Sequence, residues 1–273
     1  AIQASFHVDP WITGAALTVL TAVVVLGGIQ SISKATSFIV PFMAIVYVLG
    51  GLAIIFLHYD KVIPAVELIC RSAFGLDAVV GGAIGTAIRY GVARGVFSNE
   101  SGMGSAPIAA AAAKTDHPCR QALVSMTGTF LDTLVVCSIT GIVLVIGGLY
   151  ATSGDTGAAL TSHTFNDLLP GPGGWLVTFG LVFFAYSTIL GWCYYGEKCA
   201  SYLGGEKVVP IYRVIYVVTV LLGAGVNLGL VWAAADVFNG LMAVPNLIAL
   251  LLLSNVIVSE TRDFIQKRRS GEL

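Results

Sequence analysis

The sequence predicts an all-α protein, a polytopic bundle of membrane helices. Of its 273 residues, 56% are hydrophobic and 11% are charged, whereas an average soluble domain carries about 25% charged residues. The mean hydropathy is +0.88, and 32 glycines suit a bundle in which small residues let helix backbones approach closely. Repeated apolar stretches of about 20 residues, the length that crosses a hydrocarbon core, complete the argument.

Charge and cysteine content exclude several classes of function. The 14 basic and 15 acidic residues leave a net charge of -1, so binding to nucleic acid is not expected. The five cysteines form no C-x-x-C pair, so neither a zinc site nor a disulfide framework is predicted. Ser162, His163 and Asp167 lie close together in the sequence, but no nucleophile motif accompanies them. We therefore expect neither an enzyme nor a cofactor.

Six apolar stretches are plain candidates for membrane crossings. They are residues 11–29, 38–57, 122–149, 175–195, 208–232 and 237–258. Between the second and the third lies a stretch, residues 62–113, with much glycine and several charges, which hydropathy alone would not assign. Among those charges are Glu67, Arg71, Arg89, Arg94 and Glu100.

The distribution of Lys and Arg indicates whether this stretch crosses the membrane, because both residues concentrate on the cytoplasmic side. Residues 150–174 and the expected turn at 233–236 contain none and are placed outside. One further crossing between about residues 77 and 113 then puts ten basic residues inside and only Lys61 and Arg71 outside. The prediction is seven crossings, with the N-terminus outside and the C-terminus inside. Residues 62–74 and 157–169 are expected as short surface helices that act as packing lids.

The third crossing carries the strongest functional signal. Residues 98–107 read Ser-Asn-Glu-Ser-Gly-Met-Gly-Ser-Ala-Pro at mid-membrane depth, which predicts a helix that unwinds and restarts. Freed backbone groups are tolerated at that depth only where they are buried in protein or line a cavity, and such helix ends bind ions and substrates. A packing kink is the alternative, although Asn99 and Glu100 would be costly in one.

Asp132 lies near the middle of the fourth crossing, where Thr129 and Thr133 are close to it. An ionisable group at that depth is a candidate functional residue. A carboxylate among hydroxyls suits a hard cation such as Na⁺, which prefers oxygen ligands. A structural ion pair with Arg89 or Arg94 is the alternative.

The fifth crossing places Ser187 and Thr188 side by side, with Trp192 one turn away. The two hydroxyls either form a pair of oxygen ligands beside an aromatic wall or bond back to the carbonyl four residues earlier. Asn239 and Asn246 of the last crossing are explained by hydrogen bonding between helices.

Several stretches of the sequence resemble the alanine/glycine:cation symporter family. They are RGVFSNESGMGSAP at 94–107, AKTDHP at 113–118, DTLVVC at 132–137, STILGW at 187–192, YYGEK at 194–198 and NGLMAVPNL at 239–247. The resemblance covers nearly the whole chain.

This resemblance implies a LeuT-like inverted-repeat fold, in which each five-helix repeat begins with a helix broken at the substrate. Residues 1–273 would form one transmembrane domain of an incomplete core. Residues 11–58 resemble the last two helices of the first repeat, and residues 78–258 resemble the second repeat. We therefore expect a fragment whose missing N-terminal helices belong to the full-length protein.

The resemblance also implies a substrate site and two cation sites. The substrate-binding residues would be Phe97, Asn99, Gly102, Gly104, Thr188 and Trp192. The ion-binding residues would be Ser98, Asp132, Ser187 and Thr188. No metal other than Na⁺ is expected.

The implied function is secondary active transport of a small neutral amino acid, alanine or glycine, by alternating access. The coupling ion would be Na⁺, with H⁺ in some members, and the location a bacterial or archaeal cell membrane. The main alternative is a truncated or partner-dependent membrane subunit that does not transport by itself. A channel is disfavoured because the polar groups cluster at one depth instead of lining a continuous pore.

Overall fold

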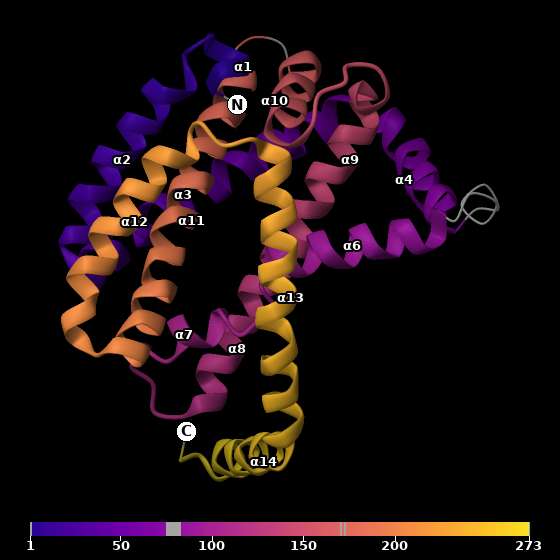
Figure 1. The fold of residues 1–273 in the computed structure, drawn as a ribbon. Helices are drawn as coiled ribbons and strands as arrows, with labels where there is room; N and C mark the ends of the chain where they lie inside the picture. The colour runs from indigo at the N-terminus through magenta and orange to yellow at the C-terminus, as the bar shows by residue number, and fades with distance from the viewer. Residues whose placement is uncertain (1, 75–82, 170, 172, 273) are drawn as a thin grey trace. The chain divides into compact units, whose positions relative to one another are not determined.

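The computed structural model describes residues 2–74, 83–169, 171 and 173–272. Every regular element in this part of the chain is a helix, which confirms the predicted all-α class (Figure 1). The chain divides into two compact units. The first comprises residues 1–85 and 135–226, and the second comprises residues 86–134 and 227–273.

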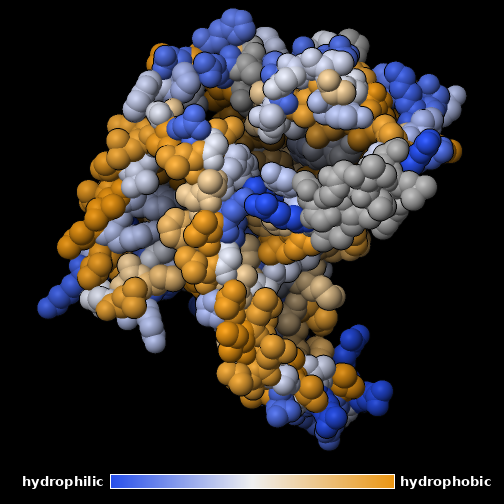
Figure 2. Space-filling view, turned by 45° about the vertical axis from the view of Figure 1, so that its right-hand side comes forward, coloured by the Kyte–Doolittle hydropathy of each residue, from blue (hydrophilic) through white to orange (hydrophobic). Residues whose placement is uncertain are grey.

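Within the described residues, four helical stretches are long and apolar enough to cross a membrane. They are Ser31–Leu57, Pro118–Gly147, Val177–Gly204 and Leu228–Leu252. Large apolar side chains remain exposed along these helices, among them Phe38, Phe56 and Leu251, and Figure 2 shows broad hydrophobic areas on the surface. Such faces suit contact with lipid tails, and the chain is a multi-pass membrane protein.

The first unit is built around the long helices α3 (Gly28–Leu57) and α11 (Gly173–Gly204), which pack along each other. Helix α2 (Pro10–Leu26) packs along α12 (Val209–Gly223). One apolar core lies among α2, α3 and α11, formed by Val25, Ile32, Tyr186, Leu190 and Cys193. The chain reverses between α2 and α3 at Gly28, whose φ of +74° is readily adopted only by glycine.

A second core of the first unit joins α3 and α11 to α9 (Ser138–Gly147) and α10 (Gly157–Leu168). Tyr47 and Phe165 meet at its centre, and the Tyr47 hydroxyl lies 2.6 Å from Thr140 Oγ1. Helix α1 (Ile2–Phe6) contacts α10, and α4 (Tyr59–Phe74) contacts α9. Short 3₁₀ turns at Leu149–Ala151 and Glu206–Val208 complete this unit.

Both predicted surface helices are present as helices. The expected stretch 62–74 is the C-terminal part of α4, and the expected stretch 157–169 is α10. Helix α10 buries Thr161, Ser162, Thr164 and Phe165 against α9 and α11. It therefore packs on the core of its unit, as expected of a lid.

The second unit contains α6 (Ala83–Asn99) from residue 86 onward, α7 (Ala106–Ala110) and α8 (Pro118–Thr129). A π-helical turn, Phe130–Cys137, follows α8 and joins the two units. Helix α13 (Leu228–Leu252) is followed after one residue by α14 (Ser254–Ser270), which turns sharply away from the α13 axis (Figure 1).

The predicted boundary between the last two crossings is wrong. The expected crossing 208–232 ends at Gly223, and the expected turn 233–236 lies inside α13. Asn227 causes this, because its side chain accepts hydrogen bonds from the N–H groups of Gly229 and Leu230 and caps α13. Three alanines at 233–235 then favour a continuing helix. The expected interval between the first two crossings, residues 30–37, is not a loop either, since Lys34 lies within α3.

Candidate functional site

The predicted break in the third crossing is present in the structure. Helix α6 ends at Asn99, and regular helix resumes at Ala106. Between them, Glu100, Gly102 and Gly104 have φ values of +55°, +81° and +87°. A left-handed conformation costs a residue with a side chain roughly 1–2 kcal/mol, and strain of this kind clusters at functional sites.

Side chains stabilise the unwound segment. Asn99 Oδ1 accepts a hydrogen bond from the Ser101 N–H at 3.0 Å, and the buried Ser105 hydroxyl donates to Glu100 at 2.8 Å. Asn246 of α13 donates to the carbonyl of Gly102 at 2.9 Å. The backbone freed by the break is thus held by α13, as buried polar groups require.

Asp132 faces the end of α6 from the π-helical turn. The Ser98 hydroxyl lies 3.0 Å and 2.8 Å from the two carboxylate oxygens of Asp132. Asn99 Nδ2 donates to Thr133 Oγ1 at 2.9 Å. Two consecutive residues of α6 therefore meet two consecutive residues of a π-helix, an element that occurs frequently at functional sites.

The structure thus brings together Ser98 and Asp132, two of the expected ion-binding residues, with Asn99 and Thr133 beside them. The carboxylate and the neighbouring hydroxyls are oxygen groups of the kind that a hard cation such as Na⁺ prefers, whereas Asn99 presents its amide nitrogen to Thr133. The ion-pair alternative does not hold for Arg94, whose guanidinium pairs with Asp236 at 2.9 Å and lies 4.4 Å from the Trp232 ring centroid.

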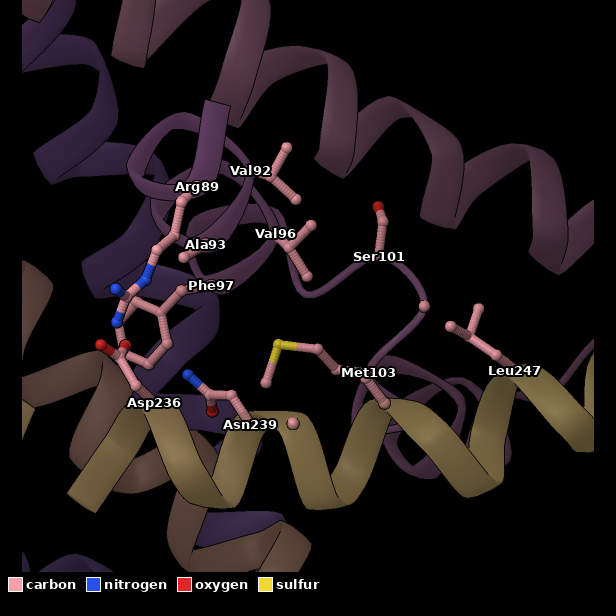
Figure 3. Close-up of a pocket in the computed structure, with 13 residues that line it drawn as sticks. Arg89, Val92, Ala93, Val96, Phe97, Ser101, Met103, Asp236, Asn239 and Leu247 are labelled. Carbon is pink, nitrogen blue, oxygen red and sulfur yellow. The ribbon is translucent and has the colours of Figure 1, made fainter. Parts of the chain in front are cut away.

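A pocket of about 550 Å³ adjoins the break (Figure 3). It lies between α6 and α13, and its wall includes the predicted substrate residues Phe97 and Gly102. Figure 3 shows the head groups of Arg89 and Asp236 at one end of the pocket and Leu247 at the other. The pocket is therefore mostly apolar, with charged groups at one end.

The remaining predicted residues lie on α11, in the first unit. The hydroxyls of Ser187 and Thr188 both donate to the Phe184 carbonyl, at 3.0 Å and 2.9 Å, so they bond back to their own helix. This arrangement uses the hydroxyl protons and leaves oxygen lone pairs. Trp192 packs edge-on against Tyr195, with ring centroids 5.7 Å apart.

Sequence reasoning missed two parts of the site. Thr133 was a neighbour of Asp132, but only the π-helical turn aims both side chains at α6. Asp236 was assigned to an outer turn, although it lies one turn after Trp232 in α13 and both contact Arg94. Asn246 was expected to hydrogen-bond to another helix, but its amide donates instead to the Gly102 carbonyl in the unwound segment.

Comparison with known proteins adds the family. The model of the sodium:alanine symporter family matches residues 1–273. The chain is 60% identical to the sodium/alanine symporter AgcS of Methanococcus maripaludis, over 99% of the chain and 60% of that protein. It is 52% identical to an uncharacterized transporter of Haemophilus influenzae, over 98% of the chain and 60% of that protein.

A third relative is the probable sodium/glutamine symporter GlnT of Bacillus subtilis, 34% identical over all of the chain and 57% of that protein. The chain thus spans about three fifths of the length of these relatives. Their names are those of transporters, which confirms the expectation that the chain is not an enzyme. The chain belongs to the sodium:alanine symporter family.

Proposed function

We propose that this protein carries a small neutral amino acid, alanine or glycine, across the cell membrane together with Na⁺ by alternating access. The observation that carries the proposal is the pairing of Ser98 with Asp132 where helix α6 ends and the chain unwinds. A negatively charged group at membrane depth is costly. A bound cation that neutralises it explains its presence in a symporter family.

Two cation sites are proposed. The first consists of Ser98 and Asp132, whose oxygens already lie within 3.0 Å of each other. The second uses Ser187 and Thr188, whose hydroxyl protons are taken by the Phe184 carbonyl and whose oxygens are therefore oriented as acceptors. Na⁺ is the coupling ion, and H⁺ is the competing candidate.

The amino acid is proposed to bind at the unwound segment, in contact with Phe97, Asn99, Gly102 and Gly104. Left-handed glycines without side chains leave the backbone of the break accessible to a ligand. Thr188 and Trp192 of α11 are the remaining residues proposed to bind the substrate. The bulk of Trp192 would then restrict the substrate to small side chains by steric exclusion.

We further propose the LeuT-like inverted repeat with seven crossings in this chain, N-terminus outside and C-terminus inside. The broken α6 supports this arrangement, because it has the form expected of the first helix of a repeat. The cluster Lys267, Arg268 and Arg269 in the last turn of α14 supports a cytoplasmic C-terminus. Further N-terminal helices that complete the core belong to the same proposal.

The test is uptake of labelled amino acid into proteoliposomes with an inward Na⁺ gradient. Thr188→Ala should weaken the Na⁺ dependence, and Trp192→Ala should admit larger substrates, with labelled glutamine as the probe. Exposed Thr152→Ala, in the loop after α9, is the matched control for the hydroxyl. Wild-type behaviour of both variants would contradict the site assignment.

The same assay distinguishes the proposed transporter from a membrane subunit that depends on a partner. If this chain takes up no alanine by itself but does so when the product of the upstream gene segment is supplied, the transport proposal and the incomplete core are both supported. If uptake is absent in either case, the chain is not the transporter proposed.

A further inference from the structure

Helix α14 has two unlike faces, and the protein occupies one of them. His117 at the start of α8 is 5% exposed, and its Nε2 lies 3.2 Å from Asp263 and 3.9 Å from Glu260. Its Nδ1 accepts the N–H of Cys119, so the neutral ring carries its proton on Nε2 and donates it to Asp263. Phe264 packs against the same ring. The acidic face of α14 is thus bound to α8.

An adjoining face of α14 is apolar and exposed. At 100° per residue, Ile257, Val258, Thr261 and Ile265 fall on one stripe of the helix. Ile257, Val258 and Ile265 are 49%, 48% and 46% exposed. An exposed apolar stripe on an otherwise polar helix is typical of a segment that lies in a membrane interface.

Three arginines accompany this stripe. Arg262 and Arg269 border it, and Arg268 lies on it about one turn beyond Ile265. Lys267, by contrast, faces inward and pairs with Asp263 at 2.8 Å. Across the parts of the chain that the structure describes, no carboxylate lies within 4.0 Å of the three arginine side chains. Their positive charge is therefore available to an anionic partner.

The position of α14 identifies that partner. Helix α13 has 25 residues, a length of about 37 Å at 1.5 Å per residue, which is enough to cross a hydrocarbon core of about 30 Å. Helix α14 begins two residues after α13 ends and runs at a steep angle to it. Figure 2 shows hydrophilic side chains gathered on α14 beside the hydrophobic surface of α13. The end of a membrane-spanning helix lies at the headgroup level.

We propose that α14 lies in the membrane–water interface, with its apolar stripe among the lipid acyl chains and Arg262, Arg268 and Arg269 bound to anionic phospholipid headgroups. The planar guanidinium forms paired hydrogen bonds with phosphate oxygens. Basic clusters next to a membrane helix gain further from the negative surface potential of the cytoplasmic leaflet. This proposal needs α13 to span the membrane with its α14 end on the cytoplasmic side, and it does not depend on transport.

The test uses the whole chain in nanodiscs of phosphatidylcholine and in nanodiscs that also contain phosphatidylglycerol. Amide hydrogen exchange of residues 254–270 is measured by mass spectrometry. Each basic residue near an anionic surface strengthens binding roughly fivefold, so we expect exchange in the phosphatidylglycerol discs to be slower by more than about tenfold. High salt should reduce the difference, because it screens exposed charges.

Two variants and one control make the test specific. The triple variant Arg262→Gln, Arg268→Gln and Arg269→Gln should abolish the difference between the two lipids. Ile265→Asp should accelerate exchange in both lipids, because it places a charge in the apolar stripe. The control variant Lys61→Gln with Arg71→Gln, on the amphipathic helix α4, should leave the exchange of residues 254–270 unchanged.

Three results would overturn the proposal. The first is equal exchange of residues 254–270 in the two lipids, and the second is a lipid difference that survives in the triple variant. The third is protection that follows protein concentration instead of lipid composition, which would assign the arginine face to a protein partner.

Discussion

At the residue scale, the account depends on the charge of Asp132 next to Ser98. Asp132→Asn keeps the shape of the side chain and removes the charge. Interactions with a charged group contribute about 1.5–3 kcal/mol, so we expect the Na⁺ concentration for half-maximal uptake to rise by roughly tenfold or more. Asp167→Asn, exposed on α10, is the control. An unchanged Na⁺ requirement in Asp132→Asn would remove this residue from the site.

The unwound segment makes a second prediction at this scale. Gly104 has a φ of +87°, and a Cβ there would lie 3.1 Å from the Asn246 side chain. We expect Gly104→Ala to lower stability by about 1–2 kcal/mol, measured as a lower thermal midpoint in detergent.

Gly95→Ala is the matched control for Gly104→Ala. Gly95 lies within α6, and a Cβ there would meet no atom within 4 Å. This substitution should stabilise the helix by about 0.5–1 kcal/mol. If both alanine variants shift the midpoint in the same direction, the left-handed turn is not what holds the break.

Mid-membrane depth was sufficient to single out Asn99, Glu100 and Asp132 as candidate functional residues, whereas Ser98 was assigned to a cation site only through the family resemblance. That Ser98 meets Asp132 and Asn99 meets Thr133 is a finding of the structure. A charged or amide group in that position needs a partner, and the sequence supplies few. The contribution of Thr133 depends on the wider π-helical turn, which hydrophobic periodicity does not indicate. Asp236 was missed because its place in α13 depends on where that helix begins.

At the scale of elements, α11 and α12 are joined by a buried ion pair. Arg213 donates to both carboxylate oxygens of Glu197 at 2.8 Å and 3.0 Å, and the Glu197 side chain is 8% exposed. Removing one partner of a buried pair costs about 3–5 kcal/mol, whereas an apolar replacement of both is far less harmful. We expect Glu197→Gln to lower the thermal midpoint strongly.

A double variant, Glu197→Leu with Arg213→Met, should recover most of the stability lost in Glu197→Gln. Ser201→Ala, which removes only the surface bond to Glu206, should change the midpoint little. If the double variant is as unstable as the single one, the loss comes from packing and not from an unpaired buried charge.

The contact between α8 and α14 predicts a dependence on pH. Hydrogen bonds from Lys267 and then His117 lower the pKa of Asp263, so the ionised carboxylate contributes stability above its ordinary pKa. That contribution is lost as the pH falls through the lowered value. The pKa of Lys267 is raised by Asp263. The contribution of the Lys267 charge to stability is therefore lost only as the pH rises through that raised pKa.

The protection of residues 254–270 against amide exchange, taken relative to the intrinsic exchange rate at each pH, should therefore fall in acid. Asp263→Asn should give fast exchange already at neutral pH and a flatter acid profile. Asp116→Asn, which removes an exposed pair with Arg120, is the control. An acid profile of Asp263→Asn that matches the wild type would contradict the role of this carboxylate.

The existence of the long apolar helices was predictable, because an apolar run of about 20 residues has few other uses. Their bounds were less so, since α3 has 30 residues and α12 has 15. The start of α13 depends on Asn227 as its N-cap. In the sequence alone, a single asparagine between apolar stretches is equally consistent with a polar group that bonds to another helix.

At the scale of the whole molecule, composition and basic-residue asymmetry predicted a multi-pass membrane protein, and the family match places it among sodium:alanine symporters. The chain spans about three fifths of its relatives' length. The break, the oxygen cluster and the adjoining pocket all belong to the second unit. Hydropathy finds such a unit's helices but not the contacts that turn them into a site.

The central claim is that this protein couples Na⁺ to the movement of a small neutral amino acid. The most direct measurement is uptake of labelled alanine into proteoliposomes that contain the product of the whole gene, with an inward Na⁺ gradient and an equal K⁺ gradient as the control. The account predicts accumulation of alanine in the Na⁺ gradient alone. Equal uptake in the two gradients, or none in either, would contradict it.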